Sequence, residues 1–325
     1  MRAVVFTGAG GNEVIDVVDR PDPQPTGNDV VVRVRYAGLN PADAQQRIGV
    51  YPAPPGSPAD IPGLEVSGVV ESCGEAVTTW APGSRVFGLV GGGGLAERVL
   101  VNERHLARIP DSMSDEDAAA VPEAYMTAHD AVRTQADLKM GETLLVHGAA
   151  GGVGSAAVQI GLAAGARVIG VVRSETAHQA VKDLGAEAVY DADFAQQVLD
   201  LTAGRGADVI LELVGAPHFP GNLDAIAARG RIIVVGVGAG SEVQLPLLRL
   251  MQKRIRMQGT VLRARAIEQK ADVVRAFERE VLPALAAGIV KPVLEQTYPA
   301  ADVAAAFDHL EGSGKVGKVL LDFGA

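Results

Sequence analysis

Cysteine is nearly absent from this sequence. Cys73 is the only thiol among 325 residues, so the chain can form no internal disulfide and offers no thiolate cluster to a metal. Basic residues are also in short supply. The formal net charge is −10, which argues against non-specific nucleic-acid binding, because that binding needs Lys and Arg to neutralise phosphates. The remaining composition, 48% hydrophobic and 21% charged, is that of a globular protein with room for two domains.

Neither a signal peptide nor a membrane span is predicted. The apolar start, residues 1–6, is too short for a signal peptide, so we expect a cytoplasmic enzyme. Residues 144–166 contain no Asp, Glu, Lys or Arg and are long enough to cross a bilayer. Glycines interrupt this run in its middle, however, and a second strand-like segment follows it directly. We therefore interpret the run as a buried strand, turn and helix, and expect no membrane contact.

A strand, a glycine cluster and a helix follow one another in this run. Residues 144–146 fit a buried strand, and residues 155–164 are rich in Ala, Val, Ile and Leu. The glycines between them form A-x-G-x-x-G, in which Ala149 replaces the first glycine of the dinucleotide fingerprint. The helix N-terminus would bind a pyrophosphate, and an ordinary glycine-rich turn is the alternative. The candidate loop residues are Ala150, Gly151, Gly152, Val153 and Gly154.

The end of the second strand determines which dinucleotide is bound. NAD-specific sites carry Asp or Glu about twenty residues after the glycines, where it binds the ribose 2′-hydroxyl. Arg173 and Ser174 occupy that place here. A guanidinium and a hydroxyl attract a 2′-phosphate, so this pair favours NADPH. Glu175 follows directly, and a solvated surface arginine remains the alternative for Arg173.

Strand-like and helix-like segments alternate through the middle of the chain. Strands are expected at 167–172, 208–214 and 231–236, with helices between them. Such alternation predicts an α/β fold with a parallel, doubly wound Rossmann sheet and helices on both faces. The N-terminal part instead shows short strands with frequent Pro and Gly, as in a mainly β domain.

The alternation of strands and helices ends after residue 261, and this change predicts the domain boundaries. We expect a catalytic domain at 1–122, completed by 263–325, and a Rossmann dinucleotide-binding domain at 123–262. Single helices are expected over 116–132 and 266–287, and a final strand over 316–323.

Several further motifs follow one another along the chain in a definite order. They occupy residues 38–43, 47–51, 62–68, 82–88, 118–122 with Thr127 and Ala128, 149–154, and 259–265. With these motifs the sequence resembles the zinc-free quinone oxidoreductase branch of the medium-chain dehydrogenase/reductase superfamily, the group that includes zeta-crystallin, over essentially its whole length. The resemblance implies that the catalytic domain is a GroES-like β-barrel, that NADPH is the reductant, and that quinones or conjugated carbonyls are the acceptors.

The resemblance also predicts the absence of a metal. Zinc-dependent relatives carry a Cys just before the Asn40 region and a His in the 63–65 motif, where this sequence has Leu39 and Leu64. The six histidines show no paired ligand spacing.

Further cofactor residues and a dimer follow from the same resemblance. Thr127 matches the position beside the nicotinamide, and the other matching positions are Gly215, Gly236, Val237, Leu262 and Arg263. Two features depart from the family. Thr176 and Ala177 replace a Lys after the second strand, and a Tyr near the end of the third strand is matched to Ala192. Relatives pair the edge segment equivalent to 255–261 across a two-fold axis, so a homodimer is expected.

Without zinc, hydrogen-bond donors must polarise the acceptor carbonyl. Tyr51, in a proline-rich loop, is the candidate donor, and the Asn40 amide is the candidate for orienting acceptor or nicotinamide. The alternatives are a packing aromatic for Tyr51 and a helix cap for Asn40. The expected function is therefore an NADPH-dependent, metal-free reductase of quinones or electrophilic carbonyls. An alkenal or enoyl double-bond reductase and a nucleotide-binding redox sensor with little catalysis remain as alternatives.

Overall fold

The computed structural model describes residues 1–324, which divide into two compact units. Unit 1 combines Met1–Met126 with the C-terminal segment from Leu262 onward, and unit 2 is Thr127–Val261. The N-terminal and C-terminal parts of unit 1 share a sheet, because β15 (Lys318–Asp322) pairs with β3 (Asp29–Gly38). As limits of functional domains, the expected boundaries at 122/123 and 262/263 stay a prediction.

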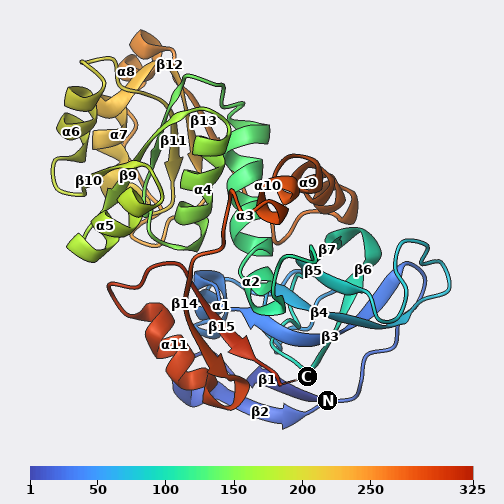
Figure 1. Ribbon diagram of the computed structural model, residues 1–325. Coiled ribbons are helices and arrows are strands. Elements are labelled where there is room, and N and C mark those ends of the chain that lie inside the picture. Colours follow the sequence, from blue (N-terminus) through green and yellow to red (C-terminus); the bar gives the residue numbers. More distant parts are fainter. Residues whose placement is uncertain (325) are drawn as a thin grey trace. The chain divides into compact units, whose positions relative to one another are not determined.

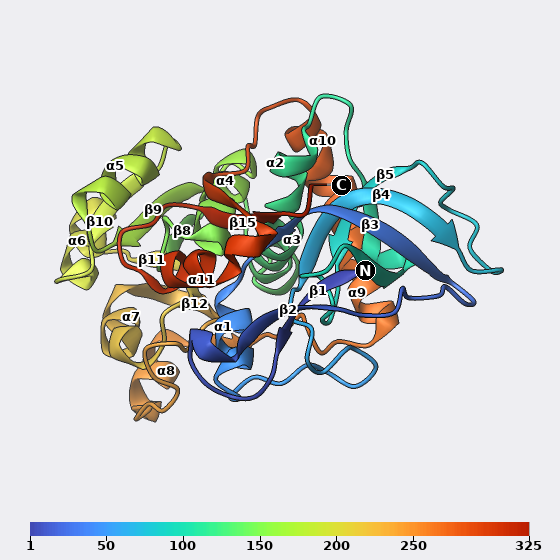
Figure 2. The same cartoon turned by 90° about the horizontal axis from the view of Figure 1, so that it is seen from below.

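Unit 2 is built on a six-stranded parallel sheet (Figures 1 and 2). Its strands are β8 (Thr143–Val146), β9 (Arg167–Val172), β10 (Glu187–Tyr190), β11 (Ala207–Glu212), β12 (Ile226–Val234) and β13 (Arg256–Gly259). The strand order β10-β9-β8-β11-β12-β13 reverses direction at β8. Open parallel sheets bind ligands at the carboxyl ends of the strands beside such a reversal. The α/β fold with a parallel Rossmann-like sheet is therefore confirmed.

Helices cover both faces of this sheet (Figure 1). They are α4 (Gly152–Ala163), α5 (Glu175–Asp183), α6 (Phe194–Leu201), α7 (Phe219–Ala225) and α8 (Leu247–Lys253). Because crossovers between parallel strands are right-handed, α4 and α5 lie on one face, and α6 and α7 on the other. The charge-free run 144–166 is thus a buried strand followed by a 12-residue helix. No helix in the described part of the chain could cross a membrane.

Unit 1 is the GroES-like β domain. Its main sheet has the order β14-β15-β3-β4-β5-β7, with β6 paired to β3, and β1 and β2 form a separate hairpin. The strands not yet given are β1 (Arg2–Phe6), β2 (Ile15–Asp19), β4 (Glu65–Cys73), β5 (Arg85–Leu89), β6 (Arg98–Asn102), β7 (Leu106–Arg108) and β14 (Leu294–Pro299). The helices are α1 (Pro41–Arg47), α2 (Asp115–Ala119), α9 (Ile267–Glu280), α10 (Leu282–Ala286) and α11 (Val303–Glu311), and α3 (Pro122–His129) continues into unit 2.

Two helices expected as single elements are divided in the structure. The segment 116–132 contains α2, α3 and the start of a π-helical stretch at Asp130–Gln135, and 266–287 contains α9 and α10. Pro122 and Pro283 stand in the first turn of α3 and α10, where a residue without an N–H is tolerated. Proline therefore marks each break.

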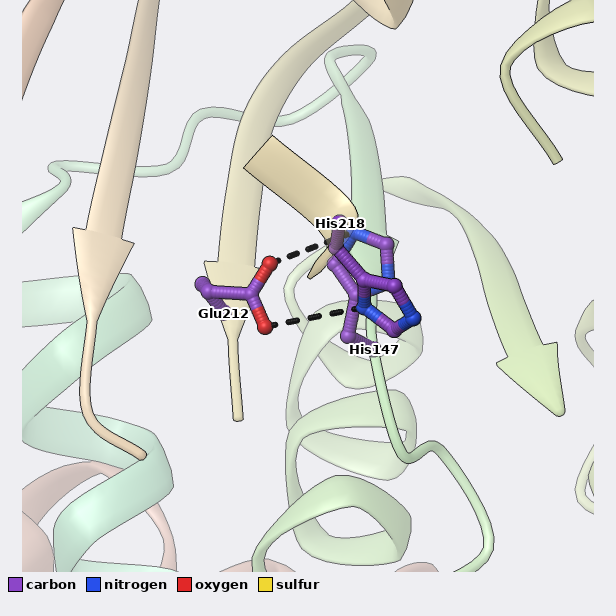
Figure 3. Close-up of side chains that lie close together, drawn as sticks. All are labelled: His147, Glu212 and His218. Carbon is purple, nitrogen blue, oxygen red and sulfur yellow. Dashed lines mark ion pairs between the residues drawn. The ribbon is translucent and has the colours of Figure 1, made fainter. Parts of the chain in front are cut away.

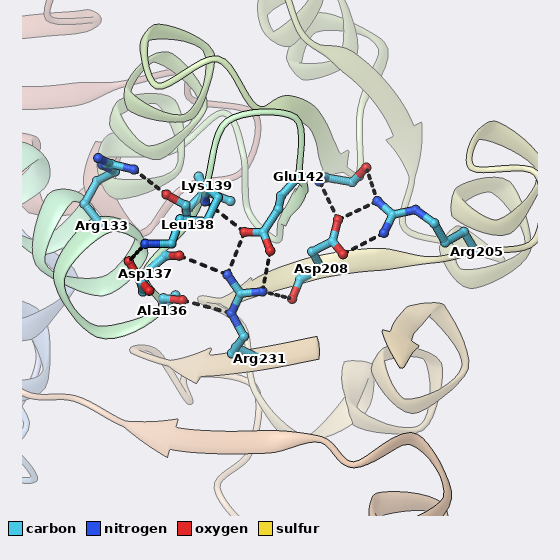
Figure 4. Close-up of polar contacts among 10 residues, drawn as sticks. Arg133, Ala136, Asp137, Leu138, Lys139, Glu142, Arg205, Asp208 and Arg231 are labelled. Atoms are coloured by element: carbon cyan, nitrogen blue, oxygen red, sulfur yellow. Dashed lines mark hydrogen bonds and ion pairs between the residues drawn. The ribbon is translucent and has the colours of Figure 1, made fainter. Parts of the chain in front are cut away.

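A polar network anchors the segment before β8 to the sheet of unit 2 (Figure 4). Arg231, in β12, donates from Nε to the Ala136 carbonyl at 2.9 Å and from Nη2 to the Asp137 carbonyl at 3.1 Å. Its two terminal nitrogens also bind the Glu142 carboxylate at 2.8 and 2.6 Å. Asp208 in β11 accepts the Thr143 N–H at 2.8 Å. This network lies at the amino ends of the strands, opposite the edge where ligands bind, so its role is stability.

We expect Arg231→Ala to lower the free energy of unfolding by about 2–4 kcal/mol, because it leaves two carbonyls unpaired and removes the positive partner of Glu142 in a largely buried place. Arg205→Ala is the matched control. Arg205 binds Asp208 at 2.5 Å, but its side chain is 53% exposed, so its loss should cost less than about 1 kcal/mol. Urea unfolding of both variants measures the difference, and equal losses would contradict this account of the network.

Candidate functional site

The turn after β8 is set by one close approach between backbones. Gly148 has a φ of +57°, which starts the turn, and α4 begins four residues later at Gly152. A Cβ at Gly154 would lie 2.2 Å from the Gly148 carbonyl oxygen, so only glycine permits α4 to start this close to β8. The first N–H groups of a helix have no partner within it, and here they lie at the carboxyl edge of the sheet.

Ala149 stands where the fingerprint has its first glycine, and a glycine on β9 makes room for its methyl group. A Cβ at Gly170 would lie 2.7 Å from the Ala149 methyl group. Gly170 therefore leaves the space that the Ala149 side chain occupies, and the turn closes as it would around glycine.

Arg173 lies at the end of β9 with its charge uncommitted. It is exposed, and its guanidinium has no hydrogen bond or ion pair with any residue in the range 1–324. Ser174 caps α5, its Oγ accepting the Ala177 N–H at 3.2 Å. Glu175 is engaged by Tyr190, whose phenol donates to its carboxylate and whose ring stacks on His178 at 4.8 Å. The carboxylate of Glu175, next to Arg173 and Ser174, is therefore already hydrogen-bonded.

The third strand ends in a tyrosine. β10 ends at Tyr190, two residues before Ala192. The match of the family's tyrosine to Ala192 stays a prediction.

The predicted residues beyond β11 and β12 are brought together. Gly215 has a φ of +117°, and a Cβ there would lie 2.4 Å from the Gly240 carbonyl and 2.9 Å from the Val237 Cα. Gly236 approaches the Leu213 carbonyl in the same way. These residues form two adjacent turns at the carboxyl edge, and Val237 is 45% exposed there.

Thr127 contributes an unsatisfied hydroxyl. The residue is 8% exposed, and its Oγ1 is buried without a hydrogen-bond partner within the described residues. A buried hydroxyl normally finds a partner, so this one suits a ligand amide such as the carboxamide of a nicotinamide.

Asn40, in unit 1, belongs to a buried charged network. Its Nδ2 donates to Glu65 Oε1 at 2.9 Å, and its Oδ1 accepts from Lys318 Nζ at 2.6 Å. Lys318 also lies 2.5 Å from Glu65, which is fully buried. Asn40 occupies the N-cap position of α1, but it is the Asp43 carboxylate that accepts the Asn40 N–H, at 2.9 Å. Its proposed role toward acceptor or cofactor stays a prediction.

Two carboxyl groups beside this network have raised pKa values. Burial raises the pKa of Asp43 to about 6, although it accepts the backbone N–H groups of Gly63 and Asn40. Burial, and then the negative charge of Glu65, raise the pKa of Glu123 to about 7. Both groups titrate near neutral pH.

Tyr51 is held by Arg263 from the far end of the chain. Arg263 Cζ lies 5.3 Å from the centre of the Tyr51 ring, and its guanidinium donates to the carbonyls of Tyr51 at 3.2 Å and Gly91 at 2.8 Å. The Tyr51 hydroxyl makes no hydrogen bond within residues 1–324, and burial raises its pKa, so it keeps its proton. Arg263 is 4% exposed and engaged inside unit 1, and Leu262 is buried at 7%. Their expected cofactor contacts stay a prediction.

One cluster of polar side chains has no signal in the sequence. His147, Glu212 and His218 lie together at the strand ends of unit 2 (Figure 3), with ligand-type atoms all within 4.8 Å of one another. Glu212 already accepts hydrogen bonds from the Val214 and Gly215 N–H groups and from Asn222, and Asn222 also occupies Nε2 of His147. Because hydrogen bonds already engage both Glu212 oxygens and Nε2 of His147, we assign no metal to the cluster. Its members are 65 and 6 residues apart along the chain, which leaves no spacing signal.

Comparisons with known proteins agree with this architecture. Residues 26–111 match the alcohol dehydrogenase GroES-like domain, and residues 152–279 match the zinc-binding dehydrogenase family. The quinone oxidoreductase of Lama guanicoe is 32% identical over 99% of this chain and 97% of its own length. A mycobacterial protein solved with NADPH is 29% identical, with a TM-score of 0.89 and coverage of 99% and 100%. The CurK enoyl reductase is 25% identical, with a TM-score of 0.87 and coverage of 99% and 98%.

The fold, the glycine turn and these relatives define an oxidoreductase of the medium-chain dehydrogenase/reductase superfamily that uses a nicotinamide cofactor and a small-molecule acceptor. Within that superfamily, the chain belongs to the quinone oxidoreductase branch, as its motifs had indicated.

The raised pKa of Glu123 predicts a pH dependence of stability. A carboxyl group whose pKa is higher in the folded state stabilises the fold fully below its ordinary value of 4.5, and this contribution is lost as the pH rises through about 7. We expect Glu123→Gln to flatten the fall in unfolding free energy across that window by roughly 2 kcal/mol.

Denaturant unfolding at several pH values measures the slope. Glu268→Gln is the control, because Glu268 is 69% exposed and pairs with Arg104 at the surface. A Glu123→Gln slope equal to that of the unchanged protein would show that this carboxyl group does not titrate in the window.

Proposed function

We propose that this protein is an NADPH-dependent, metal-free reductase of quinones or related electrophilic carbonyls. The observation that carries the proposal is the cofactor edge of unit 2, where the free N-terminus of α4 lies at the same sheet edge as the exposed, uncommitted Arg173. The helix N-terminus binds a pyrophosphate, and the guanidinium with the Ser174 hydroxyl binds a 2′-phosphate. When bound, the reduced nicotinamide supplies the hydride.

The chain's own residues hold the cofactor in this proposal. Gly151 to Gly154, with Ala150, surround the pyrophosphate, and the turns at Gly215, Gly236 and Val237 border the rest of the dinucleotide. The unpartnered Thr127 hydroxyl binds the carboxamide of the nicotinamide ring. These residues orient the cofactor, and the partnered state of Glu175 limits its repulsion of the 2′-phosphate.

The acceptor depends on Tyr51 in this proposal. Its hydroxyl donates a hydrogen bond to the acceptor oxygen as negative charge develops there, and Arg263 fixes the ring that carries it. Asn40, held by Glu65 and Lys318, keeps one lone pair of Oδ1 for an orienting contact.

Metal independence and a homodimer complete the proposal. Leu39 and Leu64, which stand where zinc-dependent relatives carry ligands, are each 1% exposed and cannot coordinate an ion. β13 is an edge strand with all four residues exposed, and α8, which precedes β13 in the chain and packs on β12, exposes Leu247, Leu248 and Met251. An apolar surface at an unpaired sheet edge suits a second copy of the chain.

Turnover distinguishes this proposal from its two alternatives. The rate of NADPH oxidation is measured with a quinone, with an enal and without acceptor, before and after prolonged chelation. Quinone-dependent oxidation that survives chelation supports the proposal. A preference for the enal favours the double-bond reductase, and tight cofactor binding without turnover favours the redox sensor.

Arg173→Ala tests the choice of cofactor. A charge-assisted hydrogen bond contributes on the order of 1.5–3 kcal/mol, so NADPH should bind roughly ten- to a hundredfold better than NADH in the unchanged protein. The variant should lose most of that preference with little change toward NADH. Lys182→Ala, which removes an exposed positive charge from the end of α5, is the control. Equal affinity of the unchanged protein for both cofactors would refute the assignment.

Tyr51→Phe tests the acceptor. Loss of one donor to a developing charge costs about 1–3 kcal/mol, so kcat/KM should fall roughly five- to a hundredfold while NADPH affinity and Tm stay the same. Tyr298→Phe is the control, because its hydroxyl bonds only His309 Nδ1, at 2.9 Å. If Tyr51 is a packing aromatic, Tyr51→Phe is silent and only Tyr51→Ala, which removes the ring over Arg263, lowers Tm.

A further inference from the structure

Three strand ends of unit 2 meet in one cluster, in which His147 and Glu212 are fully buried and the Asp191 side chain is 35% exposed. His147 follows β8, Glu212 ends β11, and Asp191 follows β10. His218, in the short turn Ala216–His218, lies between the last two, with Nε2 at 2.5 Å from Asp191 Oδ1 and Nδ1 at 3.7 Å from Glu212 Oε1. Its ring also packs 4.2 Å from that of His147 (Figure 3).

Glu212 fixes the direction of every hydrogen bond around it. Its Oε1 accepts the N–H groups of Val214 at 2.7 Å and Gly215 at 2.9 Å, and its Oε2 accepts from Asn222 Nδ2 at 2.6 Å. Asn222 must therefore present Oδ1 to Nε2 of His147, at 2.6 Å, and that nitrogen must carry the proton. Nδ1 of His147 is buried without a partner, so the ring stays neutral, and burial lowers its pKa to about 4.

His218 is the histidine of this cluster whose neighbours favour its charged form, which raises its pKa. Burial disfavours its charged form, but Glu212 and Asp191 outweigh that effect and raise its pKa above 6.5. Burial also opposes the charge of Glu212, yet His218, His147 and the two backbone N–H groups lower the pKa of this carboxyl to about 2. The ring of Phe194 on α6, 5.5 Å from that of His218, is uncharged.

Each member of the cluster is joined to a residue of the proposed cofactor edge. His147 directly precedes Gly148 of the glycine turn, and Asp191 directly follows Tyr190, which engages Glu175. Glu212 binds the Gly215 N–H, and the His218 N–H donates to the Gly215 carbonyl at 3.1 Å. A change of charge or position in the cluster therefore acts on the turns beside the dinucleotide.

We propose that His218 is a positioning residue whose positive charge, held between Glu212 and Asp191, keeps the turns of unit 2 in place for an anionic dinucleotide. With His218 protonated, the trio carries a net charge of one negative unit. Loss of the proton doubles that charge beneath the phosphate-binding edge and releases the contact between the β10 and β11 ends. Cofactor affinity therefore falls as the pH rises through the pKa of His218. This inference rests on the proposed binding of NADPH at this edge.

The test is the pH dependence of the dissociation constant, measured from about pH 6 to about pH 9. NADH is the main probe, because the 2′-phosphate of NADPH itself titrates near pH 6. The constant for NADH should rise about three- to tenfold over this range in the unchanged protein. His218→Gln should remove the pH dependence. Asp191→Asn keeps the imidazole but removes one partner, so its transition should move to lower pH.

His309→Gln is the matched control, because His309 pairs with Glu295 at 3.4 Å in unit 1 and should leave the profile unchanged. A purely structural role for His218 would lower Tm in His218→Gln and leave the pH dependence as it was. NMR of the histidine ring carbons gives the titration of His218 directly.

Three results would overturn the inference: a dissociation constant that does not vary with pH, a His218→Gln profile like that of the unchanged protein, or an Asp191→Asn transition that does not move. If neither NADH nor NADPH binds at all, the proposed function is refuted as well. If they bind without the expected pH dependence, only the inference about His218 fails.

Discussion

The close approach of Gly154 to the Gly148 carbonyl is the constraint on which the functional edge of unit 2 depends. It lets α4 begin directly above the end of β8, at the point where the strand order reverses. The unpaired N–H groups of α4 are thereby fixed at the sheet edge that also carries Arg173 and Gly215. The compensation between Ala149 and Gly170 shows that the first glycine of the fingerprint is replaceable where a neighbour leaves room for a methyl group, whereas Gly154 is not.

Unit 1 orients its polar side chains with buried charges. Lys318 and Glu65 hold the Asn40 amide, and Arg263 holds the loop of Tyr51. A buried ion pair returns little net stability, because desolvation offsets most of its attraction. We therefore infer that these contacts serve to fix orientation. Burial raises the pKa of both Asp43 and Glu123, and the negative charge of Glu65 adds to the effect at Glu123.

The sequence alone predicted the features of the fold that depend on local residue patterns. The Rossmann unit followed from alternating strands and the glycine turn, and the branch of the superfamily followed from ordered motifs. Prolines at 122 and 283 divided helices that composition alone had joined, and β14 and α11 were not anticipated. The His147, Glu212 and His218 cluster was beyond reach, because only the sheet brings its members together. Nor does any local pattern indicate that Arg263 binds the distant carbonyls of Gly91 and Tyr51 inside unit 1.

The central claim is that reduced nicotinamide bound at the edge of unit 2 gives hydride to an electrophilic acceptor. The most direct test is the kinetic isotope effect on kcat/KM with NADPH deuterated at C4, on either face, and a quinone as acceptor. The account predicts a primary isotope effect for one face only, because the protein fixes the ring in one orientation. Oxidation of NADPH that is equally fast with both deuterated faces and with unlabelled NADPH, at substrate levels where chemistry limits the rate, would contradict it.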